Sequence, residues 1–272
     1  MQRTVALAPG LTEVCRLGLA TRGNTHLKPE DVEWAIKRGV NYLNWCGHPD
    51  GLSCAVARMG SVRKQVMVAA QFQARSAREA EREFASMLEE LKTDHIDVLT
   101  LYYVESQGEW DAITAPGGAW EYLHEQKRNG RLKMIGLTSH QRSLAAQWAQ
   151  SEKLDLLMIR YNAAHRGAER DVFPVTQQLD IPVVTFTGLR WKALLDNTPD
   201  DPPGFIPPAA AECYRFGLTH PAVAVALAAP GNRSELDHAL SLLDDWRAPE
   251  EQAQERMLAH GDRVRKHAGT FW

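Results

Sequence analysis

Several side chains that can donate protons or hydrogen bonds follow short apolar runs in this sequence. Asn44, Gln71 and Tyr102 each close such a run, and His48 follows Asn44 by four residues. A tyrosine hydroxyl can deliver a proton to a reacting group, and a neighbouring histidine or carboxylate, here His48 or Asp50, can polarise it. The side chains of Asn44 and Gln71 are uncharged amides that both donate and accept hydrogen bonds. These residues are candidates for a proton-transfer site.

A second set of side chains is suited to binding phosphate or carboxylate. Arg190 and Lys192 follow the seventh apolar run, and Arg233 comes two residues after Gly231 at the start of a helical pattern. Guanidinium and ammonium groups bind anions through charge-assisted hydrogen bonds, and a helix N-terminus favours the same charge. The sequence therefore predicts an anion-binding region near these residues.

Eight short apolar runs must position both sets. Continuous Val, Ile and Leu runs of this length are typical of parallel strands buried on both faces. The predicted strands are Val14–Leu19, Val40–Asn44, Val66–Gln71, Val98–Tyr102, Met134–Thr138, Leu156–Ile159, Val183–Thr187 and Val223–Leu227. Helical patterns alternate with them, over Pro29–Arg38, Ala77–Leu91, Trp120–Asn129, Arg142–Ser151, Gly167–Leu179 and Arg233–Leu243, and a last helix covers Pro249–His267.

This alternation predicts an α/β fold with a parallel sheet. An open, doubly wound sheet would usually carry a G-x-G-x-x-G turn after its first strand, and Leu17–Gly23 lacks it. We therefore expect one closed (β/α)8 TIM barrel over residues 1–272, with an N-terminal extension and a C-terminal helix. The Pro-rich stretch Thr198–Pro208 is expected to be a long loop over the mouth of the barrel, where such folds place their active sites.

Several segments of this framework resemble the aldo-keto reductases in order and spacing, from about Val14 to Leu243. The segments that carry the resemblance are Cys15–Thr21, Gly39–Leu43, Leu91–Val98, Met134–Thr138, Tyr161–Asn162 and Pro230–Arg233. The order and spacing of these segments together are what is specific for the family, more than any single segment. The resemblance implies a barrel that uses a nicotinamide cofactor to reduce carbonyl groups.

The four side chains that this family uses for proton delivery are all replaced here. The resemblance places the family's Asp at Asn44, its Tyr at Pro49 beside His48, its Lys at Gln71 and its His at Tyr102. The family's Asp and Lys form a buried ion pair, and both charges are absent, so we expect Asn44 and Gln71 to hydrogen-bond to each other as a neutral network. Trp45 stands where the family has a small residue and is expected to narrow the pocket or to stack on a flat ligand.

The resemblance also implies a set of cofactor contacts. Thr138 and Ser139 would hold the nicotinamide amide, although Met158 replaces a glutamine that normally helps. Phe186 would stack on the nicotinamide, and Arg233 matches the contact to the adenosine 2′-phosphate, which favours NADP(H) over NAD(H). The loop that wraps the diphosphate corresponds to Thr187, Gly188, Leu189, Arg190 and Lys192, and Gly231 completes the set.

Other features bound the possible functions. The net charge is −3, so no basic excess indicates nucleic acid or an anionic membrane as a partner. No run of about 18 apolar residues predicts a membrane span, and no signal peptide is evident. The four scattered cysteines fit no metal site and favour a cytoplasmic setting. Arg160 and His165 follow the sixth strand and could bind an anionic group of a small-molecule substrate.

Three functions therefore stay open at this point. The first is a divergent NADP(H)-dependent oxidoreductase with a rebuilt proton-delivery site and very low activity on ordinary aldehydes. The second is a barrel without catalytic activity that binds a nucleotide or a partner. The third is a lyase or isomerase that uses His48, Tyr102 or Asp50. Fold alone does not decide among them, because barrels support many chemistries.

Overall fold

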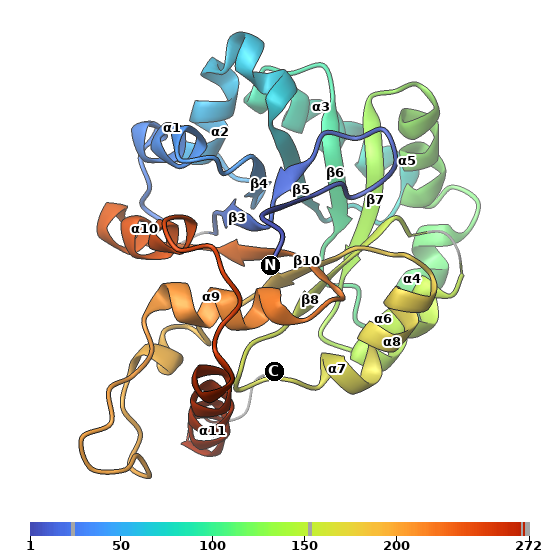
Figure 1. Cartoon of the computed structure of the whole chain (residues 1–272). Helices are drawn as coiled ribbons and strands as arrows, with labels where there is room; N and C mark the ends of the chain where they lie inside the picture. The colour runs from blue at the N-terminus through green and yellow to red at the C-terminus, as the bar shows by residue number, and fades with distance from the viewer. Residues whose placement is uncertain (23–24, 152–153, 268, 270–272) are drawn as a thin grey trace.

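Eight parallel strands close into a barrel, surrounded by a layer of helices (Figure 1). The computed structural model describes residues 1–22, 25–151, 154–267 and 269. Around the barrel the strands run in the order β10, β3, β4, β5, β6, β7, β8 and β9. Their bounds are β3 Leu17–Ala20, β4 Tyr42–Trp45, β5 Met67–Phe72, β6 Ile96–Leu101, β7 Leu132–Thr138, β8 Leu156–Arg160, β9 Val183–Phe186 and β10 Val223–Ala228. The predicted (β/α)8 barrel is confirmed.

Side chains alternate along each strand between the barrel interior and the helix layer, as the two-residue period of a strand requires. In β6, Val98 belongs to the apolar cluster inside the barrel, whereas Leu99 belongs to the cluster between barrel and helices. Both are fully buried. A strand that is buried on both faces therefore has a continuous run of apolar residues in its sequence.

The helices and 3-10 turns form the outer layer. Ser76 illustrates how they begin: its hydroxyl accepts a hydrogen bond from the Glu79 amide, and the Glu79 carboxylate accepts one from the Ser76 amide. The helices are α1 Pro29–Lys37, α2 Gly51–Arg58, α3 Ala77–Leu91, α4 Gln107–Thr114, α5 Ala119–Arg128, α6 Arg142–Ala149, α7 Ala168–Asp171, α8 Phe173–Gln178, α9 Ala210–Thr219, α10 Arg233–Leu240 and α11 Glu251–His267. The 3-10 turns are η1 Gly60–Gln65, η2 Ala193–Leu195 and η3 Ser241–Leu243.

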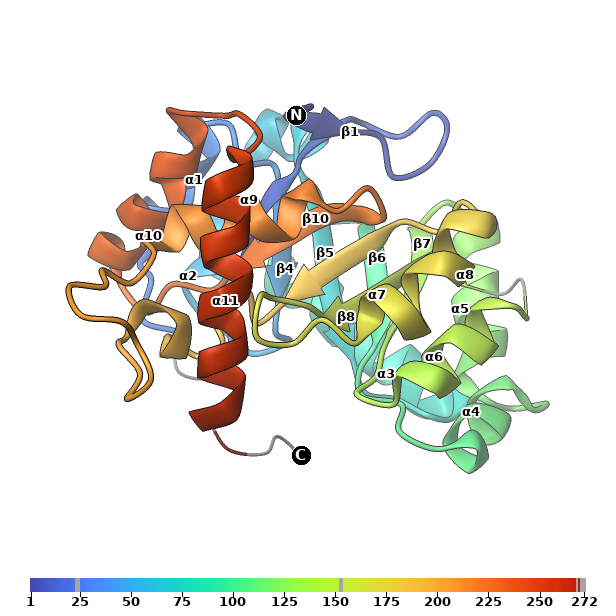
Figure 2. The same cartoon turned by 60° about the horizontal axis from the view of Figure 1, so that its bottom comes forward.

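The N-terminal extension is a short hairpin that closes one end of the barrel. Strands β1 (Thr4–Val5) and β2 (Val14–Cys15) pair antiparallel, and Figure 2 shows them at one end of the molecule. Leu7 and Val14 pack into the interior cluster. The prediction of one strand over Val14–Leu19 was therefore wrong. The predicted strand is interrupted at Arg16, whose guanidinium donates hydrogen bonds to the backbone oxygens of Leu218 and Val223 at 2.9 and 2.7 Å.

Two further differences concern helices. The single helix predicted over Gly167–Leu179 is two helices, α7 and α8, because Val172 leaves helical geometry at φ −125° just before the Phe173–Pro174 pair. Proline lacks the N–H that would continue the α7 ladder. The structure also contains helices α2, α4 and α9, which the sequence analysis did not predict.

The Pro-rich stretch Thr198–Pro208 is a loop, as expected, but it does not lie over the mouth of the barrel. None of its residues lines the pocket described below. It packs against α11, where Asp201 pairs with Arg263 at 2.5 Å and Phe205 stacks on His260 with ring centroids 4.9 Å apart. Figure 2 shows α11 running along the outside of the barrel.

Candidate active site

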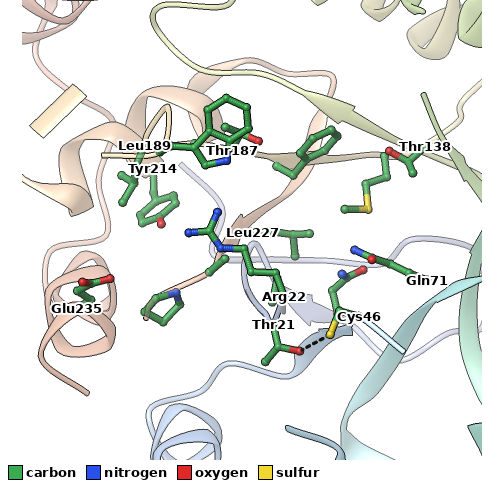
Figure 3. Close-up of a pocket in the computed structure, with 18 of the residues that line it drawn as sticks. Thr21, Arg22, Cys46, Gln71, Thr138, Thr187, Leu189, Tyr214, Leu227 and Glu235 are labelled. Carbon is green, nitrogen blue, oxygen red and sulfur yellow. Dashed lines mark hydrogen bonds between the residues drawn. The ribbon is translucent and has the colours of Figure 1, made fainter. Parts of the chain in front are cut away.

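A pocket of about 440 Å³ opens at the end of the barrel where the parallel strands finish (Figure 3). It collects residues that end strands or follow them in the chain, which is where barrels of this architecture carry their functional groups. The lining residues used below are Ala20, Arg22, Asn44, Cys46, His48, Gln71, Tyr102, Tyr103, Thr138, Met158, Phe186, Thr187, Gly188, Leu189, Trp191, Lys192, Tyr214, Leu227, Glu235 and His238.

All four residues predicted for proton chemistry line this pocket, namely Asn44, His48, Gln71 and Tyr102. The predicted hydrogen bond between the two amides is wrong. Asn44 is 1% exposed, and neither its Nδ2 nor its Oδ1 atom has a hydrogen-bond partner. The pocket lining therefore contains an unpartnered amide at Asn44, and not a closed amide network.

Tyr102 is paired with its neighbour. The Tyr102 and Tyr103 rings lie with their centroids 3.9 Å apart. Burial, followed by the hydrogen-bonding influence of Tyr103, raises the pKa of Tyr102. On its other side, Tyr103 stacks on His140 with centroids 4.2 Å apart, and His140 Nδ1 lies 3.1 Å from Glu105. The Arg75 guanidinium donates to the Tyr102 carbonyl oxygen at 2.8 Å, which fixes the end of β6. Tyr102 is thus held in the protonated form.

Two neighbours of His48 have structural roles that the sequence did not reveal. Asp50 was considered as a group that polarises Tyr102, but its carboxylate caps α2 by accepting hydrogen bonds from Leu52 and Ser53, both at 2.9 Å. Trp45 was expected to narrow the pocket or stack on a ligand. Instead it packs in the helix layer at 2% exposure, where its indole Nε1 donates to the His48 carbonyl oxygen at 2.7 Å.

Six of the ten residues predicted to bind cofactor line the pocket: Thr138, Phe186, Thr187, Gly188, Leu189 and Lys192. The loop after β9 has a left-handed backbone at Thr187, Arg190, Trp191 and Lys192, with φ between 51° and 75°. Non-glycine residues rarely adopt this geometry, and such strain is concentrated at functional sites. Lys192 Nζ pairs with Glu235 at 2.5 Å, which joins this loop to α10.

The other four predicted cofactor residues, Ser139, Arg190, Gly231 and Arg233, lie outside the lining. Arg190 is turned toward the C-terminal segment and donates to the Gly269 carbonyl oxygen at 3.1 Å. Burial, together with the charge of Arg160, lowers the pKa of Arg190 to about 10.

Arg233 is held by the surrounding helices. Its guanidinium pairs with Asp31 at 3.3 Å and with Asp237 at 3.1 Å. It also lies over the Trp34 ring, 4.8 Å from the centroid. A phosphate bound here would have to compete with two carboxylates.

Arg160 and His165, predicted to bind an anionic group, also lie outside the lining. The Arg160 guanidinium lies over the rings of Phe186 and Trp191, at 6.0 and 5.5 Å. His165 Nε2 lies 3.2 Å from Arg142. Burial and the charges of Arg160, Arg142 and Arg190 lower the pKa of His165 to about 4, so its ring is neutral at physiological pH.

The structure adds pocket residues that the sequence analysis missed. Arg22 lies just beyond β3 and its side chain extends into the pocket, as do Trp191, Tyr214 and Glu235 (Figure 3 labels Arg22, Tyr214 and Glu235). A first strand that ends at Ala20 would have indicated Arg22, because residues that follow strand ends line the pocket. Cys46 accepts a weak hydrogen bond from Thr21 at 3.8 Å.

Neither a metal site nor a membrane-spanning helix is present in the part of the chain that the structure describes. Within residues 1–22, 25–151, 154–267 and 269, no three or more His, Cys, Asp or Glu side chains are grouped as a metal site would require. Over the same ranges, no helix combines the length and apolar character needed to cross a membrane.

Comparisons with known proteins support the resemblance. The structure is similar to aldo-keto reductase AKR11C1 from Bacillus halodurans, with a TM-score of 0.75 and 14% identity over 97% of this chain and 96% of that one. An aldo/keto reductase from Brucella melitensis gives 0.73 and 15% identity, covering 96% and 98% of the two chains. At these identities the likeness establishes the fold alone.

Sequence comparison extends this to the family. The uncharacterized oxidoreductase YrpG of Bacillus subtilis is 27% identical over 114 residues, which span 40% of this chain and a third (33%) of that protein. A sequence model described as "Aldo/keto reductase family" matches residues 24–210, more than half of the chain. With its closed barrel and a pocket at the strand ends, the chain belongs to the aldo/keto reductase family.

Proposed function

We propose that the protein is a divergent NADP(H)-dependent oxidoreductase that reduces a carbonyl group of a small molecule with a rebuilt proton-delivery site. The observation that carries this proposal is the position of Tyr102, a protonated hydroxyl that lines the same pocket as Phe186 and the loop Thr187–Lys192. The few scattered cysteines of the sequence favour a cytoplasmic setting for this activity.

The pocket residues fit a nicotinamide dinucleotide. The Thr138 hydroxyl is fully buried without a hydrogen-bond partner and would bind the carboxamide, while Phe186 would stack on the ring. Lys192 would meet the diphosphate once released from Glu235. Reduced nicotinamide supplies a hydride when bound. We propose NADP(H) over NAD(H) because of Arg233. Since Arg233 pairs with Asp31 and Asp237, the titration below compares the two dinucleotides directly.

Proton delivery is assigned to Tyr102. A raised pKa keeps the hydroxyl protonated at neutral pH, so it can donate to a carbonyl oxygen on which negative charge develops. The same raised pKa makes Tyr102 a weak acid. Gln71, Asn44 and His48 line the pocket with it and contribute hydrogen bonds but no lysine charge. We therefore expect slow reduction of ordinary aldehydes.

The alternative is a barrel that binds nucleotide without catalysis, as a sensor or regulatory subunit. The replacement of all four family side chains, at Asn44, Pro49, Gln71 and Tyr102, favours it. A lyase or isomerase has less support, since Asp50 is occupied in capping α2.

The experiment is a titration of the purified protein with NADPH and with NADH, followed by tryptophan fluorescence. Trp191 lines the pocket with 51% of its surface exposed, so a bound nicotinamide dinucleotide should quench it. We expect saturable quenching that is stronger with NADPH, reduced in Trp191→Phe, and without NADPH preference in Arg233→Ala. If neither NADPH nor NADH binds, the result would contradict both the oxidoreductase proposal and the nucleotide-binding alternative.

A further inference from the structure

The loop along one side of the pocket, Thr187–Lys192, has an unfavourable backbone conformation. Four of its six residues, none of them glycine, have a positive φ: 60° at Thr187, 54° at Arg190, 51° at Trp191 and 75° at Lys192. This left-handed region is uncommon for any side chain, and a β-branched residue such as threonine is an outlier in it. Strained residues persist only where surrounding contacts hold them, so the loop needs partners outside itself.

One such partner lies just beyond the end of the neighbouring strand β8. Asn162 is 1% exposed, and its Nδ2 atom donates a hydrogen bond to the Thr187 carbonyl oxygen at 2.8 Å. The same oxygen accepts a hydrogen bond from the Arg190 amide at 2.9 Å, which closes the turn from Thr187 to Arg190. The Thr187 carbonyl is therefore tied both to its own turn and to the end of the barrel, and its direction is fixed.

Asn162 is itself held in place. Its Oδ1 atom accepts a hydrogen bond from the Ala164 amide at 2.9 Å. Its backbone forms a bridge with His165, whose amide donates to the Asn162 carbonyl oxygen at 2.9 Å. Because one side-chain atom accepts and the other donates, these partners fix a single orientation of the amide. An aspartate in its place would keep the acceptor but would lose the donor that faces Thr187.

Helix α9 packs against the same turn from another side. A Cβ atom on Gly188 would lie 3.0 Å from a ring carbon of Tyr214, which is 3% exposed. This close approach limits where the turn can move, but it does not determine the direction of the Thr187 carbonyl. That direction is determined by the hydrogen bond from Asn162.

We propose that Asn162 is a positioning residue, which holds the pocket loop in its strained conformation before a ligand binds. Most of the loop Thr187–Lys192 lines the pocket, whereas Asn162 does not, so Asn162 acts through the loop. A loop that is already ordered spares the ligand the free-energy cost of ordering it. This inference rests on the proposed function where it concerns the dinucleotide, but the order of the loop is measured without any ligand.

The first test measures hydrogen–deuterium exchange of the free, full chain by mass spectrometry. Asn162→Asp places an acceptor against the Thr187 oxygen at nearly unchanged size, and Asn162→Ala removes the side-chain donor altogether. In both variants we expect a peptide that covers Thr187–Lys192 to exchange about tenfold faster or more, while a peptide from α3 is unchanged. Asn129→Asp, at an exposed asparagine, is the matched control and should leave both peptides unchanged.

Two results of this test would overturn the proposal. Unchanged exchange of the loop peptide in Asn162→Asp and Asn162→Ala would mean that the loop holds its conformation without Asn162. Equal acceleration of the loop peptide and the α3 peptide would mean that Asn162 stabilises the whole fold and has no particular role in the loop.

The second test asks whether Asn162 acts through Thr187. Thr187→Gly removes the Cβ clash at φ 60°, so the turn should depend less on its hydrogen bond to Asn162. In the parent, Asn162→Ala should weaken NADPH binding by about tenfold. In Thr187→Gly the same change should weaken it by a clearly smaller factor, because the two positions are coupled. Equal factors in the two backgrounds would overturn the assignment to Thr187.

The two tests separate this inference from the proposed function. If the parent binds neither NADPH nor NADH while exchange of the loop depends on Asn162, the proposed function fails and the positioning role is supported. If NADPH binds to the parent and to Asn162→Ala with equal affinity, the claim that loop order serves binding is overturned, and the proposed function stands.

Discussion

The rings of Tyr102 and Tyr103 lie with their centroids 3.9 Å apart, although the two residues are adjacent in sequence. Neighbours along a strand point to opposite faces. Tyr103 departs from this rule because its φ is 47°, a left-handed conformation that is rare for a bulky residue. The bend at the end of β6 thus brings both rings into one pocket.

The first prediction concerns Tyr102. Tyr102→Phe removes the proposed proton donor and keeps the ring, so the reduction rate should fall by about 10²–10⁴-fold while dinucleotide affinity stays within a small factor. Tyr122→Phe, on α5 and outside the pocket lining, should behave as the parent does. Steady-state rates and fluorescence titrations of both variants provide the comparison. An unchanged rate in Tyr102→Phe would remove this residue from the mechanism.

The second prediction concerns a buried charge cluster at the start of β6. Asp97, 2% exposed in its side chain, pairs with Arg63 at 2.8 Å and Lys133 at 2.6 Å and accepts from the Val68 amide. Asp97→Asn would leave the buried Arg63 without its carboxylate. We expect a loss of about 3–5 kcal/mol in the free energy of unfolding, measured by urea denaturation. Asp94→Asn, at a 95% exposed side chain, is the matched control and should change it little.

How much the sequence revealed can be judged from two helix ends. The helix predicted over Trp120–Asn129 is followed by Gly130, a typical helix-ending residue, and the structure ends α5 at Arg128 with Gly130 at φ 73°. The end of α3 carries no such signal, since Lys92 occupies the left-handed position at φ 46°. Periodic apolar patterns therefore predicted the barrel and its long helices, whereas backbone conformations imposed by tertiary packing were not visible.

The candidate site likewise contains residues that the sequence indicated and residues whose positions it did not indicate. Strand ends indicated Asn44, Gln71 and Tyr102, because the carboxyl ends of parallel strands meet at one end of the barrel. Trp45 lies one residue beyond the predicted strand end, and β4 in fact includes it, so it alternates with the pocket residue Asn44 and packs in the helix layer. Pairing of Arg233 with Asp31 joins residues 202 positions apart and has no local signature.

The third prediction follows from Lys92. Lys92→Gly should raise the free energy of unfolding by about 0.5–1 kcal/mol, because glycine adopts φ 46° without a Cβ clash. The reverse change, Gly130→Ala at φ 73°, should lower it by a similar or larger amount. Thermal and urea unfolding of the two variants test the pair. A destabilised Lys92→Gly would mean that other Lys92 contacts outweigh the backbone strain.

The fourth prediction is a pH dependence. Burial and the charges of four arginines lower the pKa of His165 from 6.5 to about 4, so its protonation favours the unfolded chain. The stability associated with the neutral ring is complete above about pH 6.5 and is lost as the pH falls toward 4. Arg142→Gln removes one of those charges and should raise the pKa of His165 in an NMR titration. Arg170→Gln, an exposed neighbour that does not act on His165, should leave it in place; equal shifts in both variants would contradict this assignment.

The central claim is that this pocket transfers hydride from a reduced nicotinamide to a carbonyl carbon despite the replaced side chains. It is tested most directly by incubating the protein with NADPH deuterated at C4 and a panel of aldehydes and ketones, and by measuring deuterium in the product alcohols by mass spectrometry. The account predicts slow incorporation of one deuterium at the carbinol carbon, reduced strongly in Tyr102→Phe and unchanged in Tyr122→Phe. Product alcohols without deuterium would contradict the claim that the hydride comes from NADPH. No alcohol from any carbonyl compound, despite NADPH binding, would contradict it as well and would assign the barrel to nucleotide binding alone.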